Sequence, residues 1–369
     1  MAHRQTTAPV PNPRRPTPAR SRLSSARSGK PTAGRARLVD VANRANVSKS
    51  TASRVINGAA INVSQTTRQR ILGAVRELGY TPNAVAQALS MRSSGAIALL
   101  VPAPVSIAYT EMFQRVLTYA AERGMPAIVV IDVERAASEL TLRSLVATGR
   151  VDGVIVVSSF EGDERFDFLQ SEEVPHVYMM RAMPGSTHNV LIDDEKASAV
   201  AVEHLYELGH RRLAHVAGFS SIEATARRAK GFLRRCADLG IVGFVHEAEL
   251  NERGGFDAFR PLSEARQAPT AVYTAMVGQA LGVMRAAHSA GMQVPGDLSI
   301  ITFDNVPMCD YFTPSLTSIG IPVDSLARHA VDSLLAQIEG GRPENVVVPT
   351  EPVVLVREST GRPRAASSL

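Results

Sequence analysis

The 369-residue chain has no tryptophan, only two cysteines and few aromatic residues, which make up 5% of the sequence. Cys236 and Cys309 lack the close Cys/His spacing of a zinc site, so we expect reduced thiols and no metal. No apolar run reaches the roughly 18 residues of a transmembrane helix, and no apolar core of a secretion signal is present. We therefore expect no membrane partner and a cytoplasmic location.

The motifs of common enzymes are also missing. The sequence has no glycine-rich phosphate loop, no nucleophile elbow and no catalytic Cys/His pair. His204, His210 and His215 fall on a helix, its terminal turn and a strand, a spread that does not favour convergence on one metal ion. We expect neither an enzyme nor a bound cofactor.

Acidic residues are absent from residues 1–37, which carry eight arginines and one lysine. Residues 38–92 hold seven basic residues against two acidic ones, whereas the rest holds 24 against 33. The net charge of +5 therefore hides a basic N-terminal end, which is typical of proteins that bind a polyanion. Residues 1–36, rich in Pro and Arg, predict a disordered basic arm that adds salt-dependent affinity for DNA. A misassigned start or a solubilising tail would explain the same composition.

Two short helices joined by a polar corner are predicted between residues 38 and 57. Apolar residues recur at helical spacing in both, at Leu38, Val41, Ala42 and Ala45 and again at Ala52, Val55 and Ile56. Ser48 is a suitable N-cap for the second helix, whose other face carries Lys49, Ser50, Ser53 and Arg54. Such a unit fits a helix into the DNA major groove, where an arginine such as Arg54 forms paired hydrogen bonds with guanine.

A third helix is predicted to begin after Ser64, another N-cap, and to stop at Gly79. Its buried stripe consists of Ile71, Ala74, Val75 and Leu78. Helix-turn-helix signals are short and produce false positives. The same pattern therefore also fits a three-helix core whose polar faces contact only solvent and which does not bind DNA.

From residue 95 onward, short apolar runs alternate with helical stretches. Strands are predicted at 96–101, 127–131, 151–157, 176–180, 213–217, 242–246, 270–274, 298–302 and 346–348. Helices are predicted at 109–124, 135–148, 195–208, 224–239, 278–290 and 323–339. Continuous apolar strands alternating with helices indicate an α/β fold of two doubly wound parallel-sheet subdomains, with a cleft where the strand carboxyl ends meet.

Specific motifs in this order resemble the LacI/GalR family of bacterial transcription regulators. Val39-Asp-Val-Ala, Val47-Ser-x-x-Thr51-x-Ser53-Arg54-Val55-x-Asn57 and Leu78-Gly-Tyr-x-Pro-Asn83 are similar to its headpiece and hinge. Arg150-Val-Asp-Gly-Val-Ile, Arg228-x-x-Gly-Phe232 and Val294-Pro-x-Asp-Leu-Ser-Ile-Ile-x-Phe-Asp304 are similar to its periplasmic-binding-protein-like effector domain. The resemblance covers essentially all of residues 38–358.

The resemblance implies five parts of the chain. They are a basic arm (1–36), an all-α helix-turn-helix DNA-binding domain (37–81), a hinge helix and linker (82–94), an effector-binding and dimerisation domain of two subdomains (95–358) and a flexible tail (359–369). In the family the last segments cross back to the first subdomain, so neither subdomain is expected to be contiguous.

Residues that contact double-stranded operator DNA are also implied by the resemblance. They are Arg37, Ser48, Lys49, Ser50, Thr51, Ser53, Arg54, Asn57, Thr67, Asn83, Ala86 and Leu89. In the family, the positions of Lys49, Ser50 and Arg54 read the major groove, and the leucine matching Leu89 is wedged into the minor groove. The family often has Thr at the position of Arg37, so the first helix is expected to lack that cap and Arg37 to contact phosphate instead.

The implied effector site comprises Tyr109, Arg181, Asp193, Arg228, Met276 and Asp304. Each of the charged residues has an alternative as an internal salt bridge or helix cap. Met276-Val277 replaces an Asn-Asp pair that is usual in the family. A methionine side chain does not form the hydrogen bond that a ligand hydroxyl needs, and a buried hydroxyl without a partner costs about 1–3 kcal/mol. A less polar ligand, a nucleobase-like ring or a site without a ligand therefore stand beside the usual hexose.

Together these features predict a homodimeric, sequence-specific DNA-binding regulator, most simply a repressor, controlled by a small-molecule effector. Two alternatives are a ligand-binding module with an inactive headpiece and a regulator whose cleft responds to no ligand.

Overall fold

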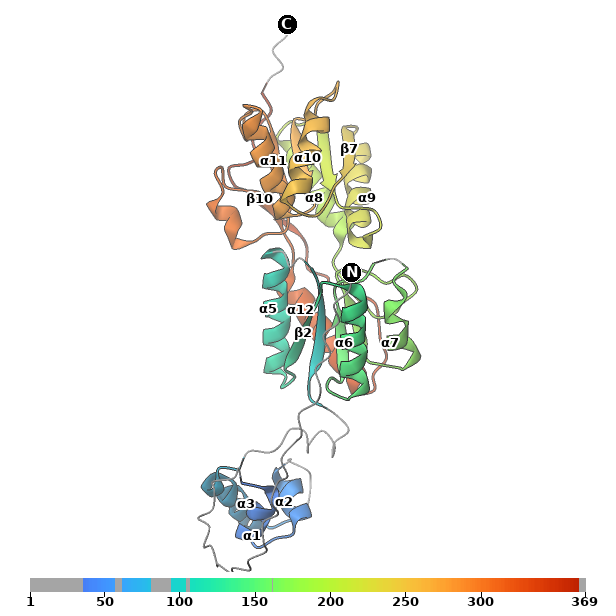
Figure 1. Cartoon of the computed structure of the whole chain (residues 1–369). Coiled ribbons are helices and arrows are strands. Elements are labelled where there is room, and N and C mark those ends of the chain that lie inside the picture. Colours follow the sequence, from blue (N-terminus) through green and yellow to red (C-terminus); the bar gives the residue numbers. More distant parts are fainter. Residues whose placement is uncertain (1–35, 57–61, 81–93, 104–106, 161, 365–369) are drawn as a thin grey trace, which may run out of the picture. The chain divides into compact units, whose positions relative to one another are not determined.

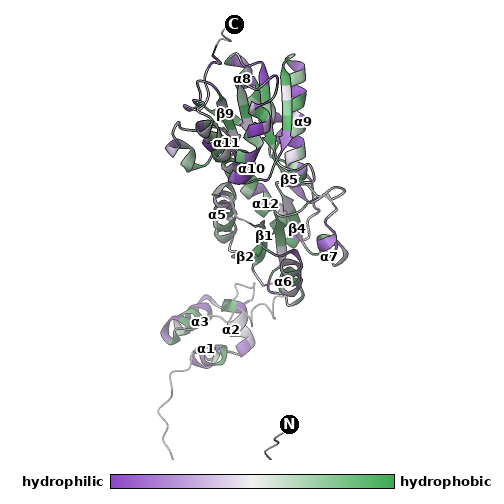
Figure 2. Ribbon diagram, turned by 45° about the horizontal axis from the view of Figure 1, so that its top comes forward, coloured by the Kyte–Doolittle hydropathy of each residue, from purple (hydrophilic) through white to green (hydrophobic). Residues whose placement is uncertain are grey.

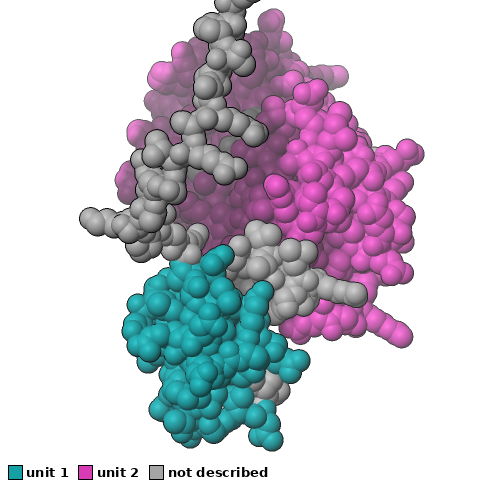
Figure 3. Space-filling view, turned by 60° about the horizontal axis from the view of Figure 1, so that its bottom comes forward, with its two compact units in different colours: residues 1–83 teal, residues 84–369 magenta. Residues whose placement is uncertain are grey.

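The computed structural model describes residues 36–56, 62–80, 94–103, 107–160 and 162–364. The chain forms two compact units, residues 1–83 and 84–369 (Figure 3). Residues 1–35 of the predicted arm lie outside the described residues, as do Asn57 and, in the predicted hinge, Asn83, Ala86 and Leu89.

The described residues of the first unit form three helices, α1 (Leu38–Arg44), α2 (Lys49–Ile56) and α3 (Gln65–Leu78) (Figure 1). Their small core consists of Val41, Ala45, Val55, Ile71 and Ala74. All of these belong to the predicted apolar stripes, so the helical periodicity identified the buried faces. The predicted limits of α3 are confirmed as well, because its first turn is capped by a serine and its end has a left-handed glycine.

In the second unit the described residues form two six-stranded sheets, each in its own subdomain (Figure 1). The first sheet has the order β11-β5-β4-β3-β1-β2, and all its pairings are parallel. Its strands are β1 (Ile97–Pro102), β2 (Ala127–Asp132), β3 (Gly153–Val156), β4 (His176–Met179), β5 (Asn189–Leu191) and β11 (Val346–Val347). Helices α5 (Ile107–Glu122), α6 (Arg135–Ala147), α7 (Asp167–Ser171) and α12 (Val323–Ile338) complete this subdomain.

The second sheet has the order β12-β10-β9-β8-β6-β7 and is parallel except at the β10–β12 pair. Its strands are β6 (Arg212–Ala217), β7 (Val242–Glu247), β8 (Ala271–Thr274), β9 (Ser299–Phe303), β10 (Thr317–Gly320) and β12 (Val353–Leu355). Helices α8 (Asp194–Glu207), α9 (Glu223–Asp238), α10 (Glu252–Ser263) and α11 (Val277–Ser289) belong to it. Hydrophobic colour concentrates on the strands in Figure 2, as expected for sheets covered on both faces.

The predicted α/β fold and the predicted crossings are confirmed. After β10 the chain returns to the first subdomain, where α12 packs on α5 and β11 pairs with β5. It then re-enters the second sheet at β12. Helices α7 and α10 and strands β5, β10 and β12 were not predicted.

The end of the chain differs from the flexible tail expected at 359–369. Ser359 is fully buried, and its hydroxyl donates to the carbonyl of Ile300 at 2.6 Å. The amide of Gly361 donates to the Ser299 hydroxyl at 3.0 Å. Residues 359–361 therefore pack against the second sheet, because these hydrogen bonds satisfy polar groups at the buried start of β9 that would otherwise be unpaired.

Candidate functional site

A row of short polar and basic side chains lies on the surface of α2. The Ser48 hydroxyl accepts a hydrogen bond from the Thr51 amide at 3.1 Å and so caps the helix as predicted. It also lies 2.8 Å from the hydroxyls of both Ser50 and Thr51. Lys49 and Arg54 are exposed on the same helix, while Ala52 and Val55 are buried. The helix thus offers hydroxyl and cationic donors to one polyanionic partner.

The Arg37 side chain makes no cap to α1, as expected, and the start of this helix forms a different hydrogen bond. The Asp40 carboxylate accepts a hydrogen bond from the Arg37 backbone amide at 2.8 Å. The Arg37 side chain is 79% exposed and only 3.9 Å from that carboxylate, which leaves its guanidinium accessible. Thr67, in contrast, has its amide and hydroxyl engaged by Ser64 at the start of α3.

A cavity of about 850 Å³ lies between the two sheets of the second unit. Its walls come from segments that follow strands of both sheets, including Ala103, Val133, Phe160 and Met180 from the first and Met276 and Asp304 from the second. This is the place where doubly wound sheets bind ligands, because the loops at the carboxyl ends of parallel strands converge there.

Arg228 and Asp304 form the charged centre of the second subdomain's wall. The Arg228 Nε donates to the fully buried Asp194 carboxylate at 2.8 Å, and its Nη1 donates to the Ala275 carbonyl at 3.1 Å. The guanidinium carbon lies 3.5 Å from the centre of the Phe303 ring. These contacts fix the guanidinium while both Arg228 and Asp304 still line the cavity.

Two properties of Asp304 are unfavourable for the stability of the folded protein. Its φ of 74° is in the left-handed region, which few non-glycine residues adopt. Burial raises the pKa of its carboxyl to about 6, although the positive charge of Arg228 opposes that rise. A carboxylate kept at such a cost inside a cavity is a candidate ligand acceptor.

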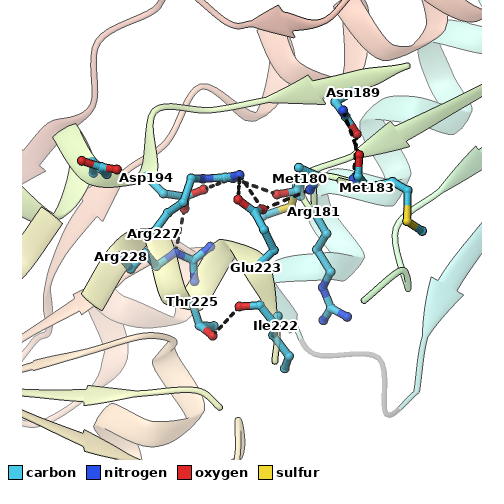
Figure 4. Close-up of polar contacts among 12 residues, drawn as sticks. Met180, Arg181, Met183, Asn189, Asp194, Ile222, Glu223, Thr225, Arg227 and Arg228 are labelled. Atoms are coloured by element: carbon cyan, nitrogen blue, oxygen red, sulfur yellow. Dashed lines mark hydrogen bonds and ion pairs between the residues drawn. The ribbon is translucent and has the colours of Figure 1, made fainter. Parts of the chain in front are cut away.

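The two subdomains are joined beside the cavity by a polar cluster of Glu223, Arg227 and Asp194, which we call the latch (Figure 4). From the other subdomain, the Ala182 amide donates to the Glu223 carboxylate at 3.1 Å. Arg227 donates to the Met180 carbonyl at 3.4 Å. The latch therefore connects α9 to the segment after β4, and any motion between the subdomains must change these contacts.

The structure brings most predicted effector residues together. Tyr109, Arg181, Arg228, Met276 and Asp304 all line the cavity. Tyr109 lies near the start of α5, where the helix was predicted to begin, and its hydroxyl accepts a hydrogen bond from Arg181 at 3.2 Å.

Asp193 lies outside the cavity. It caps α8 by accepting a hydrogen bond from the Lys196 amide at 2.9 Å, whereas its neighbour Asp194 reaches Arg228. The alternative of a helix cap therefore describes Asp193 in this structure.

Two aromatic residues of the cavity wall escaped the sequence analysis. Phe219 follows β6 and is 47% exposed, so its ring offers a stacking surface. Phe160 follows β3 and lies 4.1 Å beneath the guanidinium of Arg135. Their positions directly after two predicted strands were the available signal.

The three histidines weighed as metal ligands each have a separate partner. His204 contacts Thr360, His210 contacts Thr270 and His215 contacts the carbonyl of Tyr273. No set of three His, Cys, Asp or Glu residues suited to a metal ion occurs in the described ranges. Nor does any helix there combine the length and apolar character needed to cross a membrane.

Segments of both units match models of known protein families. Residues 37–83 match the model of the bacterial regulatory proteins of the lacI family, and residues 202–360 match a periplasmic binding protein-like domain. Catabolite control protein A of Priestia megaterium is 30% identical over 330 residues, which cover 88% of this chain and 98% of that protein. The chain belongs to the LacI family. The HTH-type transcriptional repressor PurR of Erwinia tasmaniensis is also 30% identical, over 88% of this chain and 96% of its own length.

Solved structures of LacI-family proteins agree. A lac repressor dimer bound to operator and the anti-inducer ONPF matches with a TM-score of 0.77 and 26% identity, covering 89% of this chain and all of that one. A complex of the regulator CelR with cellobiose matches with a TM-score of 0.67 and 28% identity, covering 88% and 100%. As a member of the LacI family, this chain is a DNA-binding transcriptional regulator with an effector-binding domain and not an enzyme.

Proposed function

We propose that the protein is a cytoplasmic repressor whose affinity for a pseudo-palindromic operator is set by a small molecule in the cavity between its subdomains. The observation that carries this proposal is the pairing, on one chain, of the exposed α2 row with a cavity that holds Arg228 and Asp304. A ligand that contacts both walls binds one arrangement of the subdomains better than another, and that difference shifts the population.

On DNA, Lys49, Ser50 and Arg54 read base edges in the major groove, where an arginine bonds guanine and short hydroxyls fit either base. Arg37 contacts a phosphate, since its guanidinium is exposed. The remaining contacts are carried over from the family resemblance. They are Ser48, Thr51, Ser53, Asn57, Thr67, Asn83, Ala86 and Leu89.

A homodimer is part of the proposal. Strand β2 is the outermost strand of the first sheet, and it exposes Ile128, Val129 and Ile131 at 39%, 41% and 49%. An exposed apolar edge strand is unfavourable in an isolated protein. Covering it with a second copy gives a two-fold axis, and a two-fold protein matches a pseudo-palindromic site.

The experiment is recovery of genomic fragments by the purified full-length protein at moderate salt, followed by sequencing. We expect one shared pseudo-palindrome, and we expect Arg54→Ala to abolish its recovery. Arg76→Ala removes the same charge from α3 and serves as the control.

Fragments without a shared site would contradict the proposal. They would show that only general charge attraction holds DNA, and would favour a ligand-binding module with an inactive headpiece.

A further inference from the structure

Arg181 is a half-buried cation in the cavity wall that has no carboxylate partner among the described residues. Its Nη2 donates to the Tyr109 hydroxyl at 3.2 Å, and its Nη1 lies 3.5 Å from the Ser159 carbonyl. Figure 4 shows its side chain extending away from the latch, so the Glu223 carboxylate does not neutralise it. Buried guanidinium groups are normally paired with anions, because an unpaired buried charge is costly.

Two other arginines of this region show the usual pairing. Arg165 contacts the carboxylates of Asp132 and Asp163 at 3.0 and 2.6 Å. Arg227 contacts the buried carboxylate of Asp194. Arg181 lacks the carboxylate partner that these two arginines have.

A second cation stands close to the same loop. Arg135 lies over the ring of Phe160, the residue next to Ser159, and it takes part in no ion pair in the described ranges. Both guanidiniums line the cavity, on the first subdomain's side. The acids of that side, Glu111 and Asp132, each lie within ion-pair distance of another arginine, Arg115 and Arg165. In the second subdomain's wall Arg228 is paired with Asp194, and the Asp304 carboxylate lines the cavity beside it.

We propose that Arg181, assisted by Arg135, forms a subsite for an oxyanion, so that the effector is an acid with a carboxylate or phosphate group at one end. Hydrogen-bond donors at its other end face Asp304, and its apolar middle lies among the aromatic rings. This inference rests on the proposed function, because it assigns a ligand class to the same cavity. It agrees with Met276, which offers no hydrogen bond to a neutral hexose.

The test uses full-length protein without DNA and two minimal probes, sodium phosphate and sodium acetate, with ionic strength held constant by sodium chloride. Calorimetric titration and thermal shift measure binding. We expect millimolar binding of one or both probes by the unmodified protein, and the probe that binds identifies the acid group. Arg181→Gln keeps hydrogen-bond donors without the charge and should weaken binding at least about tenfold.

The matched control is Arg150→Gln, which removes one exposed charge from the same subdomain outside the cavity and should change binding less than about twofold. Absence of binding to the unmodified protein, or equal loss in both variants, would overturn the subsite. If a probe binds through Arg181 but the protein recovers no shared DNA site, the oxyanion subsite is supported and the proposed function is contradicted.

Discussion

Replacing the strained acid of the cavity should stabilise the fold. In the folded protein burial raises the pKa of Asp304 from 3.8 to about 6, which corresponds to roughly 3 kcal/mol of unfavourable free energy when the group is ionised. Asp304→Asn removes that charge, and asparagine tolerates the left-handed φ of 74° about as well as aspartate. We expect the variant to be about 1–3 kcal/mol more stable near neutral pH.

The gain in stability of the Asp304→Asn variant should increase with pH. Well below pH 3.8 the Asp304 carboxyl is protonated in both the folded and the unfolded state, and it then costs no free energy of folding. As pH rises from 3.8 to about 6, the unfolded chain ionises first, so this group lowers stability; above that range the cost is constant. The advantage of the variant should therefore roughly double between about pH 5 and about pH 8.

Urea unfolding followed by circular dichroism at the two pH values measures the difference. Asp257→Asn is the control, because Asp257 is a 53% exposed carboxylate on α10, and its replacement should change stability by less than about 0.5 kcal/mol at either pH. A variant less stable than the unmodified protein at the higher pH, or a gain that is the same at both, would refute the reasoning. The stabilised variant should also lose its response to effector.

Outcomes are also expected for four further variants. Gly231→Ala should lower the free energy of unfolding of the effector domain, measured in urea, by at least about 2 kcal/mol, because an added Cβ overlaps the backbone of α8. Gly73→Ala should instead raise the melting temperature of the headpiece, because a Cβ at this position meets no atom within 4 Å. Ser64→Ala should cost the headpiece about 1 kcal/mol in thermal unfolding through the lost cap of α3. Glu223→Ala should speed hydrogen exchange at the Ala182 amide, which loses its acceptor in the latch; unchanged exchange would show that the latch does not hold the subdomains.

The sequence alone was sufficient for features that depend on local periodicity. The α2 row and its buried face follow from i, i+3 and i+4 spacing, and Ser48 and Ser64 cap their helices as short-range chemistry requires. Central strands such as β1 and β3 were predicted because buried parallel strands are continuously apolar, whereas the short strands β5, β10 and β12 were not predicted. Motif resemblance then supplied the family, which the comparisons confirm.

Tertiary packing decided the elements that local rules disfavour. Helix α10 contains Gly254, Gly255 and Pro261, which are poor helix formers. It forms because α10 and α11 cross closely, and a Cβ at Gly255 would overlap the backbone of Gln279. Ser359 and Gly361 likewise owe their positions to tertiary contacts, because they form hydrogen bonds with the start of β9.

The site shows the same division. Sequence motifs identified Arg228 and Asp304 as cavity residues, but they did not distinguish the roles of the adjacent residues Asp193 and Asp194. In the structure, Asp194 binds Arg228, whereas Asp193 caps the helix. Asp193 is the N-cap that precedes α8 and Asp194 is the first residue of that helix, so the way in which α8 packs on α9 decides which of the two carboxylates faces the arginine. The cavity itself joins segments after β4, β6 and β9, which are far apart in the chain, and only non-local sheet packing places the unpaired Arg181 opposite Asp304.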